Sequence, residues 1–402
     1  MSYLTLLRTR PAFRRLWAAE LISQIGDWFS LVAVSVLSLS APGGGVMVLA
    51  TALAAHLLPQ TFAAPFGGWI ADRFDKRRVL IGSALLEGVL TIAMIFAAAM
   101  AAILLLQALV VVRSAAASAR EPAAGAALPR LVEPSELRSA NALNALTWSV
   151  SFAVGMALGG VATTIGPAFA LAIDAGTFAL AALILIGLPG LDIAEPTTAP
   201  RATTPLLDIA RAFRIAWSPE LRRSVFAFGP VALVSGAGWI ALNLASQALT
   251  LAAGAATTLG ILQALRGIGT GVGPILVRKN AARWGTLAAA TTALGAVGMA
   301  WAPGLPVTAV AAFVWGGGSG AVWVLLTTEI QETSEESVRG RMIAFAGIAF
   351  ATSMAGGALL TAWLSQRGFG ILGTAAAVAV ASLIGWTLLR RRSTSAAVTL
   401  VA

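Results

Sequence analysis

Two carboxylates and an arginine interrupt apolar stretches of the chain where they could bind and release a proton. Glu20 and Asp27 stand seven residues apart in the run 16–39, and Arg113 lies in the run 101–119. A spacing of seven places two side chains on one face of a helix. Dry surroundings favour a protonated carboxyl, whereas a nearby arginine favours the charged form. Asp27 with Arg113 as its partner is therefore the first candidate for proton coupling, and Glu20 is the second. A permanent ion pair that only holds helices together is the alternative for Asp27.

Four further ionisable residues lie within apolar runs, where such groups are costly and functional by default. Arg266, in the run 257–277, could bind an anionic group of a substrate or pin helices together. For Glu87 and Asp174 a structural role that ties helices together is favoured over a role as proton carrier, although both roles stay open. His56 is the single histidine, and its place beside Pro59 favours a packing or hydrogen-bonding role.

Tryptophan is unusually common, with twelve residues against one tyrosine. Ring faces could line a cavity for large apolar or cationic compounds, although core packing or lipid contact is open for each ring. The candidates within apolar runs are Trp28, Trp239, Trp315 and Trp323. Polar residues that could donate hydrogen bonds in the same cavity are Gln24, Asn144, Asn243, Gln247 and Gln263.

The composition predicts that these residues lie in membrane-spanning helices. Of the 402 residues, 58% are hydrophobic and 11% are charged, whereas soluble proteins carry about 25% charged residues. Long continuous apolar runs indicate helices rather than the short alternating segments of a barrel. The chain has no cysteine and one histidine, which excludes disulfides, thiolate nucleophiles and most zinc sites. We expect no metal site and no cofactor.

The breaks between apolar runs predict twelve spans and an all-α membrane protein. The first six spans are expected at 16–39, 46–66, 79–99, 101–119, 140–165 and 168–188, and the other six at 223–243, 257–277, 285–302, 306–328, 342–363 and 370–389. We expect two pseudo-symmetric six-helix bundles, at 1–188 and 221–402. They are joined by a cytoplasmic linker at 189–220, in which 206–217 is an amphipathic stretch that lies on the membrane surface.

The basic residues predict the orientation. All 27 Lys and Arg except Arg113, Arg266 and Arg367 fall on one side of this twelve-span arrangement, with Arg120 counted at the end of the fourth span. The positive-inside rule makes that side cytoplasmic. We therefore expect an inner-membrane protein with both termini in the cytoplasm. Charges that flank lipid give no reason to expect nucleic-acid binding.

The loop after the second span, 67–78, has Gly68 followed after three residues by Asp72 and Arg73, and then a basic cluster that includes Arg77 and Arg78. This pattern resembles the signature loop of the major facilitator superfamily. Gly68 would let two helices approach closely. Asp72 would pair with arginines of neighbouring loops and latch the cytoplasmic side in one conformation. A tight turn with ordinary orienting charges is the alternative.

Weaker motifs extend the resemblance over nearly the whole chain. Gly155, Gly159 and Gly160 on the fifth span resemble the helix-packing antiporter motif, with Met156 where proline is usual. Arg113 resembles the mid-membrane arginine of the superfamily. The segments 127–132, 141–143 and 339–341 resemble the twelve-span branch of drug and siderophore exporters. The equivalent second-half loop, 277–283, has no aspartate.

The resemblance implies a monomeric secondary transporter that works by alternating access, with a site between the two bundles at spans 1, 4, 7 and 10. We expect proton-coupled efflux of small amphiphilic compounds. A dedicated exporter of a siderophore or other natural product is the first alternative, and an importer or lipid transporter is the next. A membrane enzyme would need a nucleophile and base or a metal set, and a receptor would need larger extramembrane domains, so both classes are disfavoured.

Overall fold

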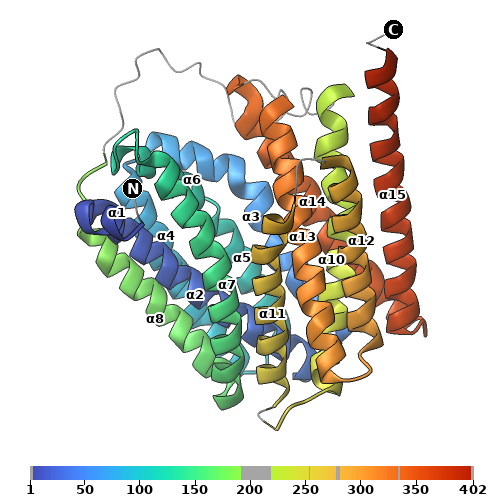
Figure 1. Ribbon diagram of the computed structural model, residues 1–402. Helices are drawn as coiled ribbons and strands as arrows, with labels where there is room; N and C mark the ends of the chain where they lie inside the picture. Colours follow the sequence, from blue (N-terminus) through green and yellow to red (C-terminus); the bar gives the residue numbers. More distant parts are fainter. Residues whose placement is uncertain (1–2, 192–218, 253, 278–280, 334–335, 400–402) are drawn as a thin grey trace. The chain divides into compact units, whose positions relative to one another are not determined.

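The computed structural model describes residues 3–191, 219–252, 254–277, 281–333 and 336–399, and its regular elements there are helices (Figure 1). The expected amphipathic stretch at 206–217 lies outside the described residues. The helices before it are α1 (Tyr3–Thr9), α2 (Pro11–Ser40), α3 (Val46–Arg73), α4 (Lys76–Ala99), α5 (Ile103–Ala117), α6 (Arg120–Ala127), the short η1 (Leu128–Arg130), α7 (Leu137–Ile165) and α8 (Pro167–Ile186). The helices after it are α10 (Pro219–Ala248), α11 (Ala255–Leu276), α12 (Ala281–Trp301), α13 (Leu305–Thr333), α14 (Glu336–Gln366) and α15 (Ile371–Thr399).

Each of the twelve expected spans is helical in the structure. Among the described residues, 11 helices or helix pairs are long and apolar enough to cross a membrane. The remaining expected span, 285–302, is formed by α12, which is not one of the 11 because its Gly, Thr and Trp residues lower its mean hydropathy. Small residues are tolerated there because they let membrane helices pack closely. The predicted all-α membrane fold is confirmed.

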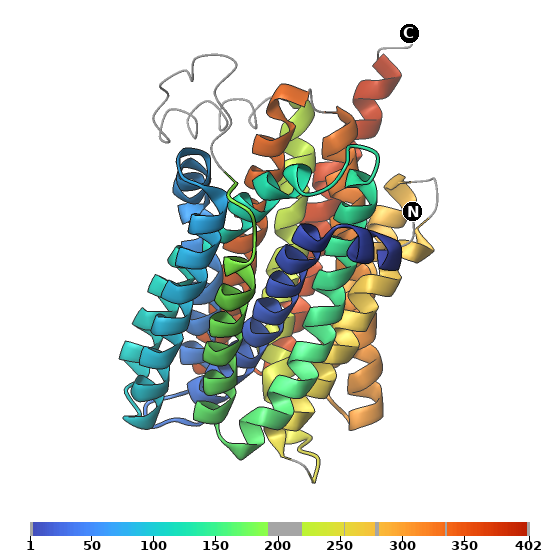
Figure 2. The same cartoon turned by 90° about the vertical axis from the view of Figure 1, so that its left-hand side faces the viewer.

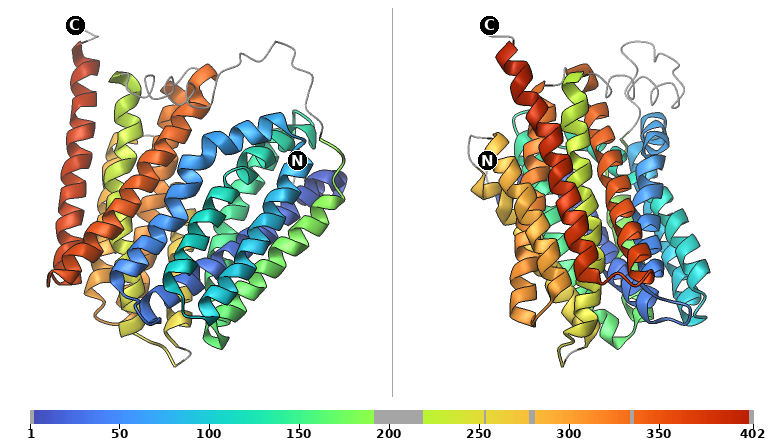
Figure 3. Two further views of the ribbon diagram at one scale, coloured as in Figure 1. Left: turned by 180° about the vertical axis from the view of Figure 1, so that it is seen from behind. Right: turned by 90° about the vertical axis from the view of Figure 1, so that its right-hand side faces the viewer.

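The chain divides into two compact units. The first unit holds α1, α2, α3 from Pro59 onward, and α4 to α8; the second holds α3 up to Leu58 and α10 to α15. The helix α3 is continuous (Figure 3), and its residues are divided between the two units at Leu58 and Pro59. His56 therefore lies in the part of α3 that groups with the second unit.

The two units repeat one packing pattern. In the first, α2 packs on α7 and α8, while α4 packs on α5 and α8. In the second, α10 packs on α14 and α15, while α12 packs on α13 and α15. In span numbers, the first span contacts the fifth and sixth of its unit, and the third contacts the fourth and sixth. This repetition is the pseudo-symmetry expected of two six-helix bundles.

The fourth span differs from its expected range, 101–119. After α5 the backbone tightens for one turn, with Ser118 N donating to Ala115 O at 3.2 Å. The chain then continues as α6, and the whole apolar segment extends over Ile103–Arg130. A short 3₁₀-like turn inside a helix often marks a hinge or a functional site. A charged residue at the end of an apolar run normally marks a membrane boundary, which is why Arg120 conceals this continuation in the sequence.

The beginning of the chain is tied to the start of α7. Figure 2 shows α1 turning away from the axis of α2. Between α1 and α2, Arg10 lies 2.9 Å from Glu136 and 3.2 Å from Glu133. The pKa of Glu136 is lowered because its carboxylate accepts a hydrogen bond from the backbone N–H of Glu133 and a further one from Arg10. This ion pair fixes the start of α2, the helix that carries Asp27.

Close helix contact at the signature loop depends on Gly67 rather than on Gly68. A Cβ atom at 68 would meet nothing within 4 Å, so the predicted close approach at Gly68 is wrong in this structure. A Cβ atom at 67 would press on the backbone of Ser118 and lie 2.8 Å from Ala119 N, at the tight turn before α6. Adjacent helix residues differ in direction by about 100°, and the sequence does not show which of two glycines faces a neighbour.

Two of the three glycines in the predicted packing motif of α7 also lie close to a neighbouring helix, α2. A Cβ atom at Gly155 would lie 2.8 Å from Trp28 Cβ, and one at Gly159 would lie 3.0 Å from Phe29 Cα. Gly160 is buried in the same helix. The close approach of α2 and α7 therefore depends on glycine, as the motif predicts.

The two neighbouring glycines of α3 provide a matched pair of substitutions. We expect Gly67→Ala to lower the free energy of unfolding by about 1–3 kcal/mol, since the added methyl group forces a shift of a packed backbone. Gly68→Ala should be neutral or stabilise the protein by up to about 1 kcal/mol, because alanine favours the helix and nothing opposes the methyl group. Thermal unfolding of both purified variants in detergent tests this, and equal melting midpoints would contradict the packing described for Gly67.

Candidate functional site

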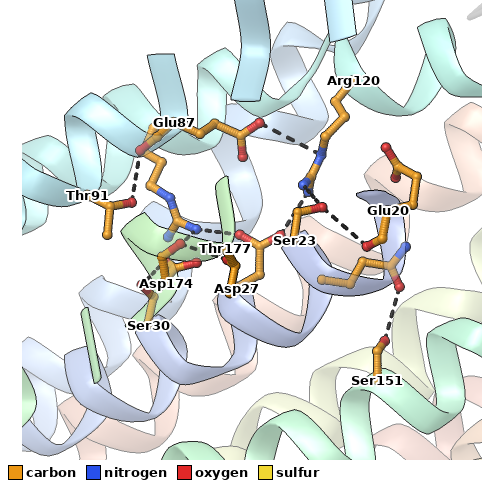
Figure 4. Close-up of polar contacts among 12 residues, drawn as sticks. Glu20, Ser23, Asp27, Ser30, Glu87, Thr91, Arg120, Ser151, Asp174 and Thr177 are labelled. Carbon is orange, nitrogen blue, oxygen red and sulfur yellow. Dashed lines mark hydrogen bonds and ion pairs between the residues drawn. The ribbon is translucent and has the colours of Figure 1, made fainter. Parts of the chain in front are cut away.

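Five charged side chains meet inside the first unit, and we call them the charge cluster (Figure 4). They come from five helices: Asp27 from α2, Glu87 from α4, Arg113 from α5, Arg120 from α6 and Asp174 from α8. Their side chains are enclosed, with exposed fractions between 0% for Asp174 and 19% for Asp27. Ionisable groups inside membrane spans pair with one another because water is scarce there.

Asp27 holds both arginines of the charge cluster. Its Oδ1 accepts a hydrogen bond from Arg113, and its Oδ2 accepts one from Arg120 at 2.8 Å. Arg113 also lies 3.1 Å from Asp174, which accepts a hydrogen bond from the hydroxyl of Ser30. Charge-assisted hydrogen bonds on each oxygen stabilise the ionised carboxylate. The predicted contact between Asp27 and Arg113 is present, and its role in proton coupling stays a prediction.

Glu87 is the most loosely bound member of the charge cluster. Its Oε1 lies 3.7 Å from Arg120 Nε, beyond hydrogen-bonding distance, and has no hydrogen-bond partner among the described residues. The side chain is 1% exposed. The ring of Phe178 lies under both guanidinium groups, 5.1 Å from Arg113 and 5.9 Å from Arg120. Glu87 and Asp174 thus link helices, as the sequence favours, but through one shared network.

Arg120 is the member of the charge cluster that the sequence reasoning missed. Its expected place among the orienting charges is wrong, because it binds Asp27 and Ser23 inside the unit. The usable signal was its spacing of seven from Arg113, the same spacing that singles out Glu20 and Asp27. Glu20 itself lies on α2 next to the charge cluster (Figure 4) and takes part in no ion pair among the described residues.

An aromatic group lies on the other face of α2, against α7. Trp28 contacts Phe152, with ring centroids 4.7 Å apart, and Trp148 at 6.0 Å. Gly155 leaves the space that Trp28 fills. The predicted Trp28 therefore has two aromatic neighbours that the sequence reasoning did not single out. Nearby, Gln24 accepts a hydrogen bond from Ser151 at 3.0 Å, whereas Asn144 is exposed on α7.

The second unit brings three predicted residues together around a cation. The guanidinium carbon of Arg266 lies 4.5 Å from the ring centroid of Trp315 and 5.7 Å from that of Trp239. Arg266 also donates a hydrogen bond to Gln263 Oε1 at 2.9 Å. Both tryptophans are buried. Cation–π contacts of this kind contribute about 0.5–2 kcal/mol, more where water is excluded.

The remaining predicted residues of the second unit have other surroundings, and one of them, Asn243, forms a hydrogen bond with the backbone. Trp323 contacts Phe228 and Phe350 instead, at 5.2 Å and 5.3 Å between ring centroids. Asn243 is buried and donates to the carbonyl of Trp239 at 2.9 Å, one turn earlier on α10. Gln247 is exposed. In the residues that the structure describes, no set of three His, Asp or Glu side chains could hold a metal ion.

Sequence comparison decides the family of a protein with this fold and this charge cluster. The model of the Major Facilitator Superfamily matches residues 16–357. The chain belongs to the major facilitator superfamily. It is therefore a multi-pass membrane protein in a family of transporters, as the resemblance of the signature loop implies.

Individual members of the superfamily are only modestly similar. The MFS-type transporter YfiS of Bacillus subtilis is 26% identical over 206 residues, which are 50% of this chain and about half (48%) of YfiS. The enterobactin exporter EntS of Citrobacter koseri is 28% identical over 400 residues, covering 92% of this chain and 91% of EntS.

Solved structures agree on the fold. The nucleoside transporter NupG, as a point mutant, superimposes with a TM-score of 0.76 at 10% identity and covers 96% of this chain and 99% of its own. A bacterial homologue of the iron transporter ferroportin, in the inward-facing state, gives a TM-score of 0.73 at 14% identity, with 97% and 100% covered. At these identities the likeness concerns the fold alone.

In the signature loop of the superfamily, Asp75 rather than Asp72 makes the structural contacts. Asp75 caps α4 by accepting from Arg78 N at 2.9 Å, and its other oxygen accepts from Leu191 N at 2.7 Å. Arg77 donates to the carbonyl of Ile186, and Arg73 lies over the ring of Trp69 at 5.5 Å. Asp72 forms no ion pair with any described residue. The latch through Asp72 stays a prediction. The side chains of the motif at 339–341 lie outside the described residues.

The two aspartates of this loop provide a test of which one stabilises the folded protein. We expect Asp75→Ala to lower the free energy of unfolding by about 1 kcal/mol or more, because an N-cap and a second backbone hydrogen bond are lost. Asp72→Ala should leave the melting midpoint in detergent unchanged. A destabilised Asp72→Ala variant with an unaffected Asp75→Ala variant would contradict the assignment of the cap.

Proposed function

We propose that the protein is a proton-coupled exporter of small amphiphilic compounds that works by alternating access. The observation that carries this proposal is the carboxylate of Asp27, held by Arg113 and Arg120 inside a membrane-spanning bundle. A proton that neutralises Asp27 would release both arginines, and these side chains connect α2 to α5 and α6. Protonation would thereby change the contacts between helices, which is what coupling to a proton gradient requires.

The contacts of the charge cluster also reach both parts of the fourth span, α5 and α6. Asp27 is bound to the two pieces of the fourth span, which meet at the tight turn around Ser118. Gly67 brings α3 against the same turn. A change in the pairing of Arg120 would therefore act at a point where the helix is already interrupted.

We assign substrate contacts in the second unit to Arg266 with Trp239 and Trp315. Two ring faces and a guanidinium group can bind aromatic and anionic parts of one compound. In the first unit, Trp28 with Phe152 and Trp148 offers a second aromatic surface. The further candidates Gln24, Asn144, Asn243 and Trp323 remain in the proposal as polar or aromatic contacts.

A dedicated siderophore exporter is the second candidate function. It is favoured by the similarity to the enterobactin exporter EntS, which extends over 92% of the chain. An aromatic, anionic compound would also suit the Arg266 group. The direction of transport distinguishes both exporters from an importer of the same fold.

We further propose that the protein lies in the inner membrane as a monomer, with both termini in the cytoplasm. The placement of the basic residues supports this orientation. Apart from Arg113, Arg266 and Arg367, and from Arg120 in the charge cluster, all of them fall on one side of the twelve expected spans.

Transport by purified protein in proteoliposomes under an imposed pH gradient tests the function. A panel of dyes, antibiotics and siderophores, with enterobactin among them, covers both candidates. We expect at least one compound to move against its gradient when protons flow in the opposite direction. If no compound responds to the pH gradient while some still equilibrate, proton coupling is wrong.

Asp27→Asn should abolish transport driven by the pH gradient and leave expression intact. Asparagine keeps the shape of the side chain, and the two arginines retain Glu87 and Asp174 as partners of opposite charge. The measurement compares gradient-driven uptake with the melting midpoint in detergent. Asp27→Glu, which keeps a titratable group, is the matched control and should retain part of the response. Efflux of Asp27→Asn with an unchanged pH dependence would show that Asp27 is only structural.

Arg266→Lys should weaken substrate binding by about 0.5–2 kcal/mol, because lysine keeps the charge but loses the planar contact with the rings of Trp315 and Trp239. The readout is the substrate concentration for half-maximal transport. Arg367→Lys is the control, since Arg367 stacks on Trp363 at the same 4.5 Å but is exposed. A lower melting midpoint for Arg266→Lys with unchanged transport would show that Arg266 only holds helices together.

A further inference from the structure

The charge cluster has one more carboxyl group than it has arginines. Arg113 and Arg120 carry two positive charges that proteins do not remove. Asp27, Glu87 and Asp174 would carry three negative charges if all were ionised. Glu20, on the neighbouring part of α2, adds a fourth carboxyl group beside Arg120 (Figure 4). Ionised throughout, the interior of the first unit would hold an uncompensated negative charge.

Such a charge is expensive inside a membrane protein. An unpaired ion costs several kcal/mol in a medium that excludes water, and a carboxyl group avoids this cost by binding a proton. Asp174 and Glu87 have side-chain exposures of 0% and 1%, so water cannot supply the missing compensation at either. At least one carboxyl group of the charge cluster therefore favours its neutral form.

The contacts differ enough to identify that group. Asp27 has one arginine on each oxygen, and Asp174 has Arg113 at 3.1 Å and the hydroxyl of Ser30. Glu87 has Arg120 Nε at 3.7 Å as its one ion-pair partner among the described residues, and its Oε1 accepts no hydrogen bond from them. Asp174 also has one oxygen, Oδ1, without a hydrogen bond from a described residue, but its other oxygen is bound by both Arg113 and Ser30. The ionised form of Glu87 is thus the least stabilised of the three.

We propose that Glu87 is the proton-binding residue of the charge cluster in this conformation. The proposal rests on the proposed proton coupling and adds a carrier to it. Arg120 is the shared partner: while it is bound to Asp27, it is too far from Glu87 to stabilise a carboxylate. When a proton from water neutralises Asp27, Arg120 can close on Glu87. Glu87 then releases its proton once a change of conformation opens the charge cluster to water, and the guanidinium stays charged throughout. Protonation of Asp27 is thereby coupled to deprotonation of Glu87 through the position of one arginine, Arg120.

Infrared difference spectroscopy of purified protein tests the location of the proton without any substrate. A protonated carboxylic acid has a C=O stretching band that a carboxylate lacks. We expect the wild-type protein to show such a band, and the band to shift in protein made with isotope-labelled glutamate. Glu87→Gln should abolish it, whereas Glu20→Gln should leave it in place. A band whose position does not shift with labelled glutamate, or that persists in Glu87→Gln, would overturn the proposal.

The stability of Glu87→Gln is a second test, because glutamine has the shape and charge of protonated glutamate. We expect an unchanged melting midpoint in detergent. A variant that fails to fold would show that Glu87 is needed as a carboxylate, and the proposal would be wrong.

Transport separates this proposal from the function on which it rests. In proteoliposomes, Glu87→Gln should lose the response to a pH gradient and still equilibrate a compound that the wild-type protein transports. If the wild-type protein responds and Glu87→Gln responds equally, the assignment of Glu87 fails while proton coupling stands. If the wild-type protein shows no response, the proposed function fails whatever the infrared band shows.

Discussion

The first unit is organised around one carboxylate that must satisfy two arginines away from water. An arginine cannot lose its charge, so Arg113 and Arg120 can be enclosed only where carboxylates reach them. Asp27 meets this requirement for both, and five helices are arranged so that their charged side chains converge near it.

The tight turn between α5 and α6 is part of the same arrangement. Arg113 and Arg120 lie on opposite sides of this turn, and both reach Asp27. Gly67 of the signature loop allows α3 to lie against the backbone of the turn. The glycine of a cytoplasmic motif thus contributes to the position of a charge inside the span, through the contact between two backbones. Asp75 of the same loop fixes the beginning of α4, the helix that carries Glu87.

The sequence predicted the spans, the helical fold and the pair of Asp27 with Arg113, because each leaves a strong local signal: long apolar runs, and charges inside them. Arg120 was missed because an arginine at the end of an apolar run has the same pattern whether it faces the cytoplasm or turns back into the bundle. Gly67 and Gly68 could not be told apart, since only the direction of the neighbouring helix decides which one is in contact. The aromatic partners of Trp28 were missed for the same reason: aromatic residues in a span give no signal that separates lipid contact from mutual packing.

The two units share a packing pattern but treat their enclosed arginines differently. In the first, carboxylates surround the arginines; in the second, Arg266 stacks on tryptophan rings. A carboxylate network can exchange protons, whereas ring faces bind the charge without offering a site for a proton. This difference favours a division of roles between proton handling and substrate contact. It also removes the apparent conflict between a structural and a coupling role for the charge cluster, because the two roles need not fall on one residue. Asp27 is bound by two arginines and connects the helices, whereas Glu87 is the more loosely bound carboxyl group, so under the proposed coupling the two can alternate in holding the proton.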